Sequence, residues 1–317
     1  MAARALSAYD LSPEATPELV NVSENTTYRV DDPATGRRAA LRVHRLDYHG
    51  RGEIESELDW VEALAADGVV ETPPVVRARD GSRVVTVATD ELADPRYVVL
   101  FDWLEGDAPR EDDVAQFRRL GALTARLHAH ARAWRRPAGF ARFTWDYETT
   151  LGPAARWGRW QDGLGIGREE LDLLGRLDGA LRRRLEAYGA AADRFGLVHA
   201  DLRLANLLVA GERTAVIDFD DAGLSWFMYD WGTAVSFIEH LPTVPEMQSA
   251  WVDGYRGVAP LAAADEAELG TFVLLRRLLL VAWVGSHHAY APEAAELGAP
   301  FTAGTCELAE RFLAGRG

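Results

Sequence analysis

Apolar and polar residues alternate in short runs through the first hundred positions, and this pattern indicates β-strands. The expected strands lie within 19–30, where a loop at 23–26 separates two of them, and at 38–44, 82–88 and 96–101. One stretch differs, because Ile54, Leu58 and Val61 recur at steps of four and three residues. That period predicts a helix over 52–66. The first part of the chain is therefore expected to be a sheet with one helix.

Helical periods dominate the remainder of the chain. The expected helices lie at 111–134, 168–192, 226–237, 245–256 and 266–288. Short apolar and β-branched runs between them predict strands at 195–198, 207–209 and 214–219. The sequence Ala-Gly-Glu-Arg separates the last two runs and is typical of a hairpin turn. The fold class expected from these patterns is α+β.

The hairpin and the loop before it hold most of the candidate chemistry. The loop contains His199, Asp201 and Asn206, and Asp218 lies near the end of the second hairpin strand. We expect the hairpin to bring Asp201, Asn206 and Asp218 together. Phosphoryl transfer needs a carboxylate that takes a proton from the attacking hydroxyl, and oxygen ligands for Mg²⁺. The ordered set matches the catalytic-loop pattern of protein kinases, which makes an acidic hairpin with merely solvated carboxylates the weaker interpretation.

We therefore assign Asp201 as the general base and Asn206 and Asp218 as ligands of Mg²⁺. His199 is expected to fix the loop by hydrogen bonding. The segments HADLRLANLLV and AVIDFDDAG resemble the aminoglycoside phosphotransferase and choline kinase superfamily of kinase-like phosphotransferases. Homoserine kinases of the second type and a bacterial stress-response Ser/Thr kinase have the same kind of pattern. The resemblance covers nearly the whole chain.

This resemblance implies a protein-kinase-like fold with two lobes. The N-lobe at 1–104 would have a small antiparallel sheet and bind the nucleotide. The C-lobe at 105–317 would be mostly helical and hold the catalytic loop and the acceptor-substrate site. By the same resemblance, ATP is the expected donor and Mg²⁺ the expected cofactor.

The resemblance also implies roles for residues of the N-lobe. Arg42 occupies the position where the family usually has a phosphate-binding Lys, and this is a departure because Arg and Lys differ in geometry. Glu57 is the expected partner of Arg42, with Glu53 as the alternative. Ser23 and Asn25 lie in the loop that closes over the nucleotide phosphates in family members.

Further roles follow from the resemblance at the lobe linker and the catalytic loop. The backbone near Asp102 and Leu104 would offer a carbonyl and an N–H to the adenine edge. Arg203 would stabilise charge on the transferring phosphate. Asp230 resembles the residue that anchors the catalytic-loop backbone, with helix capping as the structural alternative. Asp220 would be either a supporting carboxylate near the site or a solvated side chain.

A Gly-rich region at 139–165 contains Trp145, Trp157 and Trp160 without a clear period. Its tryptophans, with an acid such as Asp146, would form a wall that holds an ammonium group. Alternatively, the tryptophans pin an irregular insert to the body of the protein. The sequence supports both interpretations equally.

The 317 residues carry a net charge of −15, which argues against nucleic acid as a partner because phosphate binding needs a basic surface. The same charge is compatible with a cationic substrate, although simple solubility explains it as well. The N-terminus lacks the long apolar core of a signal peptide, and the apolar run Leu278–Gly285 is too short to span a membrane. The single cysteine, Cys306, excludes an intramolecular disulfide. We expect a cytoplasmic protein.

The function predicted from these observations is transfer of the ATP γ-phosphate to a hydroxyl of a small molecule. The expected acceptor bears an amine and is of the aminoglycoside, amino alcohol or homoserine type. One alternative is a protein Ser/Thr kinase of the stress-response type, which the short distance from Asp218 to the helix at 226–237 disfavours. The other alternative is a non-catalytic nucleotide-binding module, which only the Arg at position 42 favours.

Overall fold

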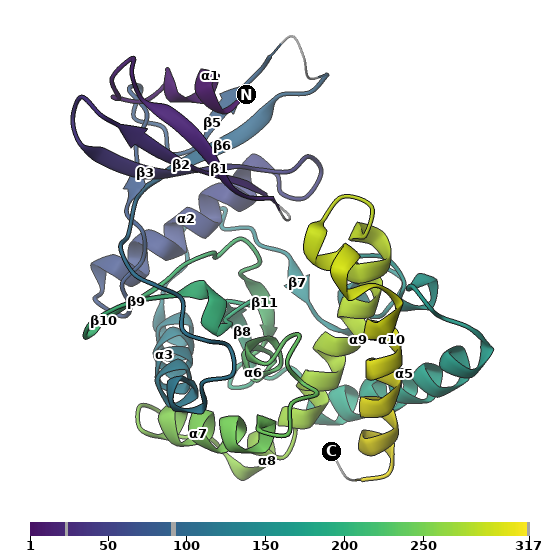
Figure 1. Ribbon diagram of the computed structural model, residues 1–317. Coiled ribbons are helices and arrows are strands. Elements are labelled where there is room, and N and C mark those ends of the chain that lie inside the picture. The colour runs from purple at the N-terminus through teal and green to yellow at the C-terminus, as the bar shows by residue number, and fades with distance from the viewer. Residues whose placement is uncertain (23–24, 90–92, 316–317) are drawn as a thin grey trace. The chain divides into compact units, whose positions relative to one another are not determined.

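The computed structural model describes residues 1–22, 25–89 and 93–315 (Figure 1). The chain forms two compact units. The first unit consists of Met1–Asp107, Arg136–Arg142 and Leu208–Asp220, and the second consists of Ala108–Arg135, Phe143–Leu207 and Asp221–Gly317. Two later segments therefore return to the first unit. The division into lobes at residue 104 remains a prediction.

The first unit is built on an antiparallel sheet of six strands. These strands are β1 (Thr16–Val22), β2 (Thr26–Asp32), β3 (Arg37–Val43), β4 (Val75–Val76), β5 (Val85–Val87) and β6 (Arg96–Asp102). They are ordered β1-β2-β3-β6-β4, and β5 also pairs with β6. The strands expected in the first hundred residues are confirmed, and 82–88 contributes the short strand β5.

Two helices pack on this sheet. Successive residues of a strand point to opposite faces, so Val98 and Val99 of β6 belong to different cores. Val98 packs in the cluster that contains α1 (Ala2–Leu6), whereas Val99 packs with Ile54 of α2 (Arg51–Ala66). Figure 1 shows α2 running along the sheet. The helix predicted at 52–66 is confirmed.

The predicted hairpin consists of β9 (Leu207–Ala210) and β10 (Arg213–Val216). Gly211 in its turn has a φ of 61°, a backbone conformation that glycine adopts without strain. The second strand ends before the predicted limit at Phe219. Asp218 has a φ of 61°, and this left-handed conformation is incompatible with a continuing strand.

The second unit is mostly helical. Its helices are α3 (Val114–Ala133), α4 (Tyr147–Thr150), α5 (Arg168–Tyr188), α6 (Tyr229–Ala234), α7 (Val244–Arg256), α8 (Ala263–Glu266), α9 (Leu269–His287) and α10 (Pro292–Leu313), with short 3₁₀ turns η1 (Trp160–Asp162) and η2 (Leu204–Asn206). A small sheet joins β7 (Thr144–Trp145), β11 (Gly223–Trp226) and β8 (Phe195–Val198), in that order. The predicted α+β class is confirmed.

Helix α9 is the buried centre of this unit and packs against α6, α10 and α5. The segment Ala263–His287 has the length and hydropathy of a membrane span. However, 83% of its most apolar window is buried inside the protein, as expected of a core helix.

Helices α3 and α7 approach each other closely, because an added Cβ at Gly121 of α3 would collide with the backbone carbonyl of Trp251 in α7.

The helix predicted over 226–237 is wrong in extent. Trp226 is the last residue of β11, where it pairs with Phe195 of β8. Helix α6 covers only Tyr229–Ala234, and Phe237 has a left-handed φ of 72°. Strand pairing with β8 thus overrides the apolar helical pattern at the start of this segment. The strands β7 and β11 and the helix α10 were not expected from the sequence.

Candidate active site

A buried ion pair joins β3 to α2. Nη2 of Arg42 donates to Oε1 of Glu57 at 2.6 Å, and both side chains are almost inaccessible to solvent. Glu57 faces inward because it shares a helical face with Ile54. Glu53, the alternative partner, instead accepts a hydrogen bond from the backbone N–H of Gly50. Glu57 is therefore the carboxylate that holds Arg42, while the nucleotide-binding role of the pair remains a prediction.

Two carboxylates that follow β10 also face Arg42. Its Nη1 lies 3.7 Å from Oδ1 of Asp218 and 3.9 Å from Oδ1 of Asp220. The Asp218 side chain is half-exposed, whereas Asp220 is buried, so the solvated alternative for Asp220 is wrong. Burial lowers the pKa of Arg42, but the charges of Glu57, Asp220 and Asp218 outweigh burial and raise this pKa.

Asp220 is flanked by two buried histidines that sequence reasoning missed. Nδ1 of His44 lies 3.5 Å from one oxygen of Asp220, and Nε2 of His49 lies 3.5 Å from the other. Burial and the charge of Arg42 hold the pKa of His44 well below its usual range. Burial opposes the charged form of His49 too, yet hydrogen bonds to Asp220 and Glu53 raise its pKa. The two histidines bracket one carboxylate, which no periodicity in the sequence could reveal.

Asn25, at the turn between β1 and β2, is buried. Its Oδ1 accepts a hydrogen bond from the backbone N–H of Arg45 at 3.3 Å. The side chain therefore ties the turn to the end of β3. Ser23, the other residue assigned to this loop, lies outside the described residues. Phosphate binding by this loop remains a prediction.

The predicted linker backbone begins where β6 ends. The N–H of Asp102 donates to the carbonyl of Pro74 at 2.8 Å, and the Asp102 carboxylate accepts from Arg37 at 2.7 Å. Within the described part of the chain, the N–H of Leu104 donates to no other group. This pattern suits a linker in which Asp102 supplies a carbonyl and Leu104 an N–H, which remains a prediction for adenine binding.

In the second unit, Asp230 holds the loop that carries the candidate base. Its carboxylate is fully buried and accepts hydrogen bonds from the backbone N–H of Ala200 at 2.8 Å and of His199 at 3.3 Å. Nε2 of His128 lies 2.9 Å from the same carboxylate. Ala200 has a φ of 64°, which is strained for a residue other than glycine. Asp230 therefore stabilises an unfavourable backbone, and it lies inside α6, whose N-cap residue is Met228.

Asp201 and Asn206 are in direct contact within this loop. Nδ2 of Asn206 donates to the backbone carbonyl of Asp201 at 2.8 Å and to its Oδ2 at 2.9 Å. The Asp201 side chain is 16% exposed, and Nδ1 of His199 accepts a hydrogen bond from the Asp201 N–H at 3.3 Å. His199 thus fixes the loop, as predicted. Because Asp218 belongs to the other unit, the meeting of all three proposed active-site side chains remains a prediction.

Two arginines lie beside the Asp201 carboxylate. Nε of Arg203 lies 3.5 Å from its Oδ1, and Nη2 of Arg276 donates to the same oxygen at 2.9 Å. Arg203 also approaches Glu111, with Nη1 at 3.4 Å from Oε1. Burial raises the pKa of Asp201, but Arg203 and Arg276 outweigh burial, so the net pKa lies below its usual value. The carboxylate is therefore ionised near neutral pH, which is the form that a general base requires.

Sequence reasoning missed Arg276. A signal was present, because Arg276 and Arg277 interrupt a long apolar helical run. A buried arginine needs a partner, so such a position indicates a specific contact. The partner of Arg276 is Asp201, and the partner of Arg277 is Glu239 at 2.7 Å.

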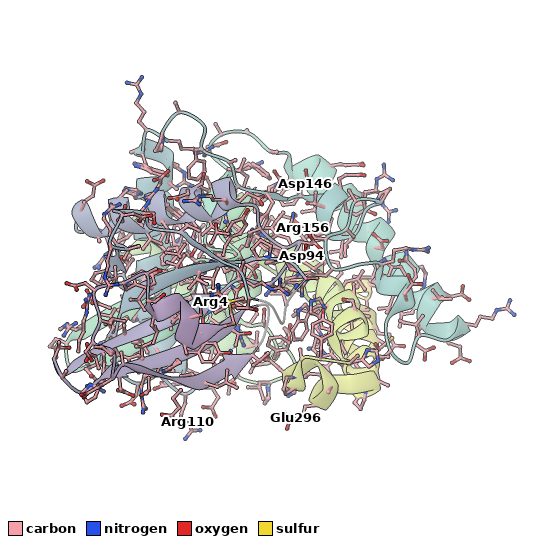
Figure 2. The ribbon with its side chains drawn as sticks, turned by 90° about the horizontal axis from the view of Figure 1, so that it is seen from above. Arg4, Asp94, Arg110, Asp146, Arg156 and Glu296 are labelled. Atoms are coloured by element: carbon pink, nitrogen blue, oxygen red, sulfur yellow. The ribbon has the colours of Figure 1, made fainter. Side chains whose placement is uncertain are left out.

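The contacts of the tryptophan-rich region favour the packing interpretation. Trp145 and Trp160 are buried, and their indole N–H groups donate to the backbone carbonyl of Asp221 and to Asp178. Figure 2 labels Asp146 and Arg156 in this region. Asp146 caps α4 by accepting from the N–H of Thr149. Arg156 lies 3.9 Å from the ring centroid of Phe143, in a cation–π contact.

Trp226 and Trp231 are also buried core residues. The indole N–H of Trp226 donates to the carbonyl of Gly189 at 2.8 Å. Trp157 differs from the other tryptophans because its ring lies 5.0 Å from the guanidinium of Arg276. This one tryptophan therefore connects the region to the candidate base.

The residues proposed as metal ligands suit Mg²⁺ in their chemistry. Nδ2 of Asn206 donates both of its hydrogen bonds to Asp201, and Oδ1 accepts no hydrogen bond from the described residues. Asp218 offers a half-exposed carboxylate. Among the described residues, no group of three His, Cys, Asp or Glu side chains could hold a metal ion alone. Mg²⁺ in such enzymes is usually bound by one or two protein oxygens together with the nucleotide phosphates.

Comparison with known proteins identifies the family. Residues 18–267 match the phosphotransferase enzyme family. This protein belongs to that family. A solved microcompartment-associated aminopropanol kinase is 53% identical, with a TM-score of 0.92, over 100% of this chain and 98% of the other.

Two more distant relatives are also kinases of small molecules. A homoserine kinase of Gluconobacter oxydans (strain 621H) is 30% identical over 68% of this chain and 66% of its own length. The structure of the amicoumacin kinase hAmiN, in complex with AMP-PNP, Ca²⁺ and Ami, is 23% identical with a TM-score of 0.77. It covers 96% of this chain and 91% of the other and shows the same fold. The kinase-like fold and the superfamily predicted from the sequence are confirmed. The prediction that the protein is a phosphotransferase with an alcohol group as acceptor is also confirmed.

Proposed function

We propose that this protein transfers the γ-phosphate of ATP to the hydroxyl of a small amine-bearing alcohol, of the size of aminopropanol. The observation that carries the proposal is the full-length similarity, at 53% identity, to an aminopropanol kinase. The direct contact between Asp201 and Asn206 supports catalysis by this chain. The net charge of −15 suits a cationic acceptor and gives no support for nucleic acid as a partner.

In the proposed reaction, Asp201 orients the acceptor hydroxyl and takes its proton. The hydroxyl oxygen forms a bond to the γ-phosphorus, the bond from that phosphorus to the β–γ bridging oxygen breaks, and ADP leaves with the electron pair. Asn206 keeps the carboxylate in place by binding its Oδ2. Mg²⁺, held by Asn206 and Asp218, would neutralise charge on the phosphates. Arg203 supplies a further positive charge next to Asp201.

The first unit would bind the nucleotide. Arg42 is charged and fixed by Glu57, so its guanidinium is positioned to bind phosphate oxygens. The Arg in place of the usual Lys is thus accommodated by a specific ion pair, which weakens the case for a non-catalytic module. The backbone of Asp102 and Leu104 would bind adenine, and the turn with Ser23 and Asn25 would cover the phosphates.

The protein-kinase alternative is disfavoured by the chain after Asp218. The short strand β11 lies between this residue and the start of α6 at Tyr229, and the few residues that flank the strand leave little room for an activation segment. We propose a cytoplasmic enzyme that acts on a free metabolite.

The test is ATP consumption with a panel of acceptors. The panel contains aminopropanol, ethanolamine, choline, homoserine, aminoglycosides, simple sugars and a generic Ser/Thr protein substrate. We expect turnover with a small amino alcohol and a loss of about 10²–10⁴-fold in the Asp201→Asn variant, since a general base contributes that factor. Turnover with the protein substrate alone would overturn the proposal, and so would unchanged turnover in the variant.

A further inference from the structure

Arg276 contacts the proposed base from a helix that lies outside the catalytic-loop motif. Its Nη2 donates to Oδ1 of Asp201 at 2.9 Å, while Asn206 donates to Oδ2 at 2.9 Å. Each oxygen of the carboxylate therefore has one fixed donor, on opposite sides of the group. Two such hydrogen bonds restrict rotation of the carboxylate about its Cβ–Cγ bond, whereas a single hydrogen bond would permit that rotation.

Each nitrogen of the Arg276 guanidinium has a hydrogen-bond partner in the second unit. Nε lies 3.3 Å from Oγ of Ser236, and Nη1 lies 3.4 Å from the hydroxyl oxygen of Tyr229. The ring of Trp157 lies 5.0 Å from the guanidinium carbon. With every nitrogen engaged and the side chain only 3% exposed, Arg276 is not placed to bind a phosphate or an acceptor itself.

The position of Arg276 is fixed by a largely buried helix of the second unit. Helix α9 packs against α5, α6 and α10, so its side chains cannot shift without disturbing the core. A buried arginine loses much of its hydration, and contacts with other protein groups must replace the lost hydrogen bonds to water. The ion pair thus connects the rigid core to a loop whose backbone is strained at Ala200.

From this arrangement we propose that Arg276 is a positioning residue, which holds the Asp201 carboxylate at the angle needed to meet the acceptor hydroxyl. The inference rests on the proposed function, because it acts through Asp201. It adds a residue of α9 to the catalytic loop that carries Asp201 and Asn206. Misplacement of a reacting group by about 1 Å can cost about 10²-fold in rate, so the expected effect of losing Arg276 is on kcat.

Arg277 offers a matched control on the same helix. It is equally buried, and it pairs with Glu239 and with Oγ1 of Thr305 rather than with Asp201. The variants Arg276→Lys and Arg277→Lys each keep the charge and remove the planar guanidinium, so both carry a comparable cost to folding. We expect Arg276→Lys to lower kcat roughly 10- to 100-fold. We expect Arg277→Lys to leave kcat within about threefold of wild type, although its unfolding midpoint falls.

A double-mutant cycle that combines Arg276→Lys with Asp201→Asn distinguishes positioning of the carboxylate from a purely structural role of Arg276. If Arg276 acts through the carboxylate, Arg276→Lys should change kcat by no more than about twofold in the Asp201→Asn background, because the group it positions is gone. The KM values for ATP and acceptor should stay within about threefold. A loss that is equal in both backgrounds would overturn the inference, as would equal losses in the two lysine variants.

The outcome is separable from that of the proposed function. If the wild-type protein phosphorylates no member of the acceptor panel, the proposed function fails. If the wild-type protein is active and Arg276→Lys retains its kcat, only the inference about Arg276 fails. Should Arg276→Lys not fold, Trp157→Ala removes the ring that faces the Arg276 guanidinium and so loosens the position of this side chain. An unchanged kcat in that variant, together with unchanged KM values, would count against the inference.

Discussion

Asp230 provides a direct test of how the catalytic loop is held in place. The Asp230→Ala variant would leave the N–H groups of Ala200 and His199 without their acceptor, together with Nε2 of His128. Each buried donor left without a partner costs about 1–3 kcal/mol. Relief of the left-handed backbone at Ala200 would return about 1–2 kcal/mol. Three such donors together cost about 3–9 kcal/mol, so the expected net loss in the free energy of unfolding is about 1–8 kcal/mol. The usual cost of breaking a buried charged contact, about 3–5 kcal/mol, lies in the middle of this range.

Urea unfolding followed by tryptophan fluorescence measures this loss. The matched control is Asp253→Ala, which removes an exposed aspartate paired with Arg118 in the same unit. Such a surface pair contributes about 0–1 kcal/mol. Asp230→Asn should fall between the two, because the amide keeps one acceptor oxygen but loses the second. Equal unfolding midpoints for Asp230→Ala and Asp253→Ala would refute the reasoning, since the fully buried carboxylate would then hold nothing of consequence.

Three further predictions concern the buried polar pairs and the close packing of helices. Arg42→Met should destabilise the protein by about 3–5 kcal/mol in urea unfolding, and most of that loss should be recovered when Glu57→Met is added; no recovery would contradict the buried-pair account. Burial lowers the pKa of His128 despite the opposing hydrogen bond with Asp230, so unfolded chains bind a proton below about pH 6.5 that folded chains do not. Stability should therefore fall with decreasing pH through that range, and the slope should be smaller in His128→Gln; identical slopes would exclude His128 as the source. Gly121→Ala should cost at least about 1–3 kcal/mol, measured by thermal unfolding, because the new methyl group collides with a backbone carbonyl of α7, and an unchanged Tm would show that the helices move apart freely.

The strands and the hairpin followed from local sequence patterns. Alternation of apolar residues predicted β2, β3 and β6, because successive side chains of a strand point to opposite faces of the sheet. The helical period over 52–66 also placed Glu57 on the buried face with Ile54. Where tertiary pairing competes with local preference, the prediction was wrong, as at Trp226, which pairs in β11 instead of beginning a helix.

The candidate base and metal ligands were proposed from residue type and spacing, since Asp201, Asn206 and Asp218 occur around one hairpin in the order of the kinase pattern. Contacts between distant parts of the chain could not be found in this way. Arg276 follows Asp201 by 75 positions and reaches it only because α9 is buried beside the loop. His44 and His49 meet Asp220 for a similar reason, across more than 170 positions.

The sequence by itself determined the class of fold, the family and the set of residues that suit phosphoryl transfer, because these depend on short-range periodicity and on motif spacing. Only the tertiary structure decided the pairings of buried charges that no motif connects. It joined Arg276 to Asp201 and placed His44 and His49 beside Asp220. It also selected Glu57 rather than Glu53 as the partner of Arg42. The physical reason is that a buried charge must be compensated by a partner, and that partner is chosen by the packing of whole elements rather than by neighbours in the sequence.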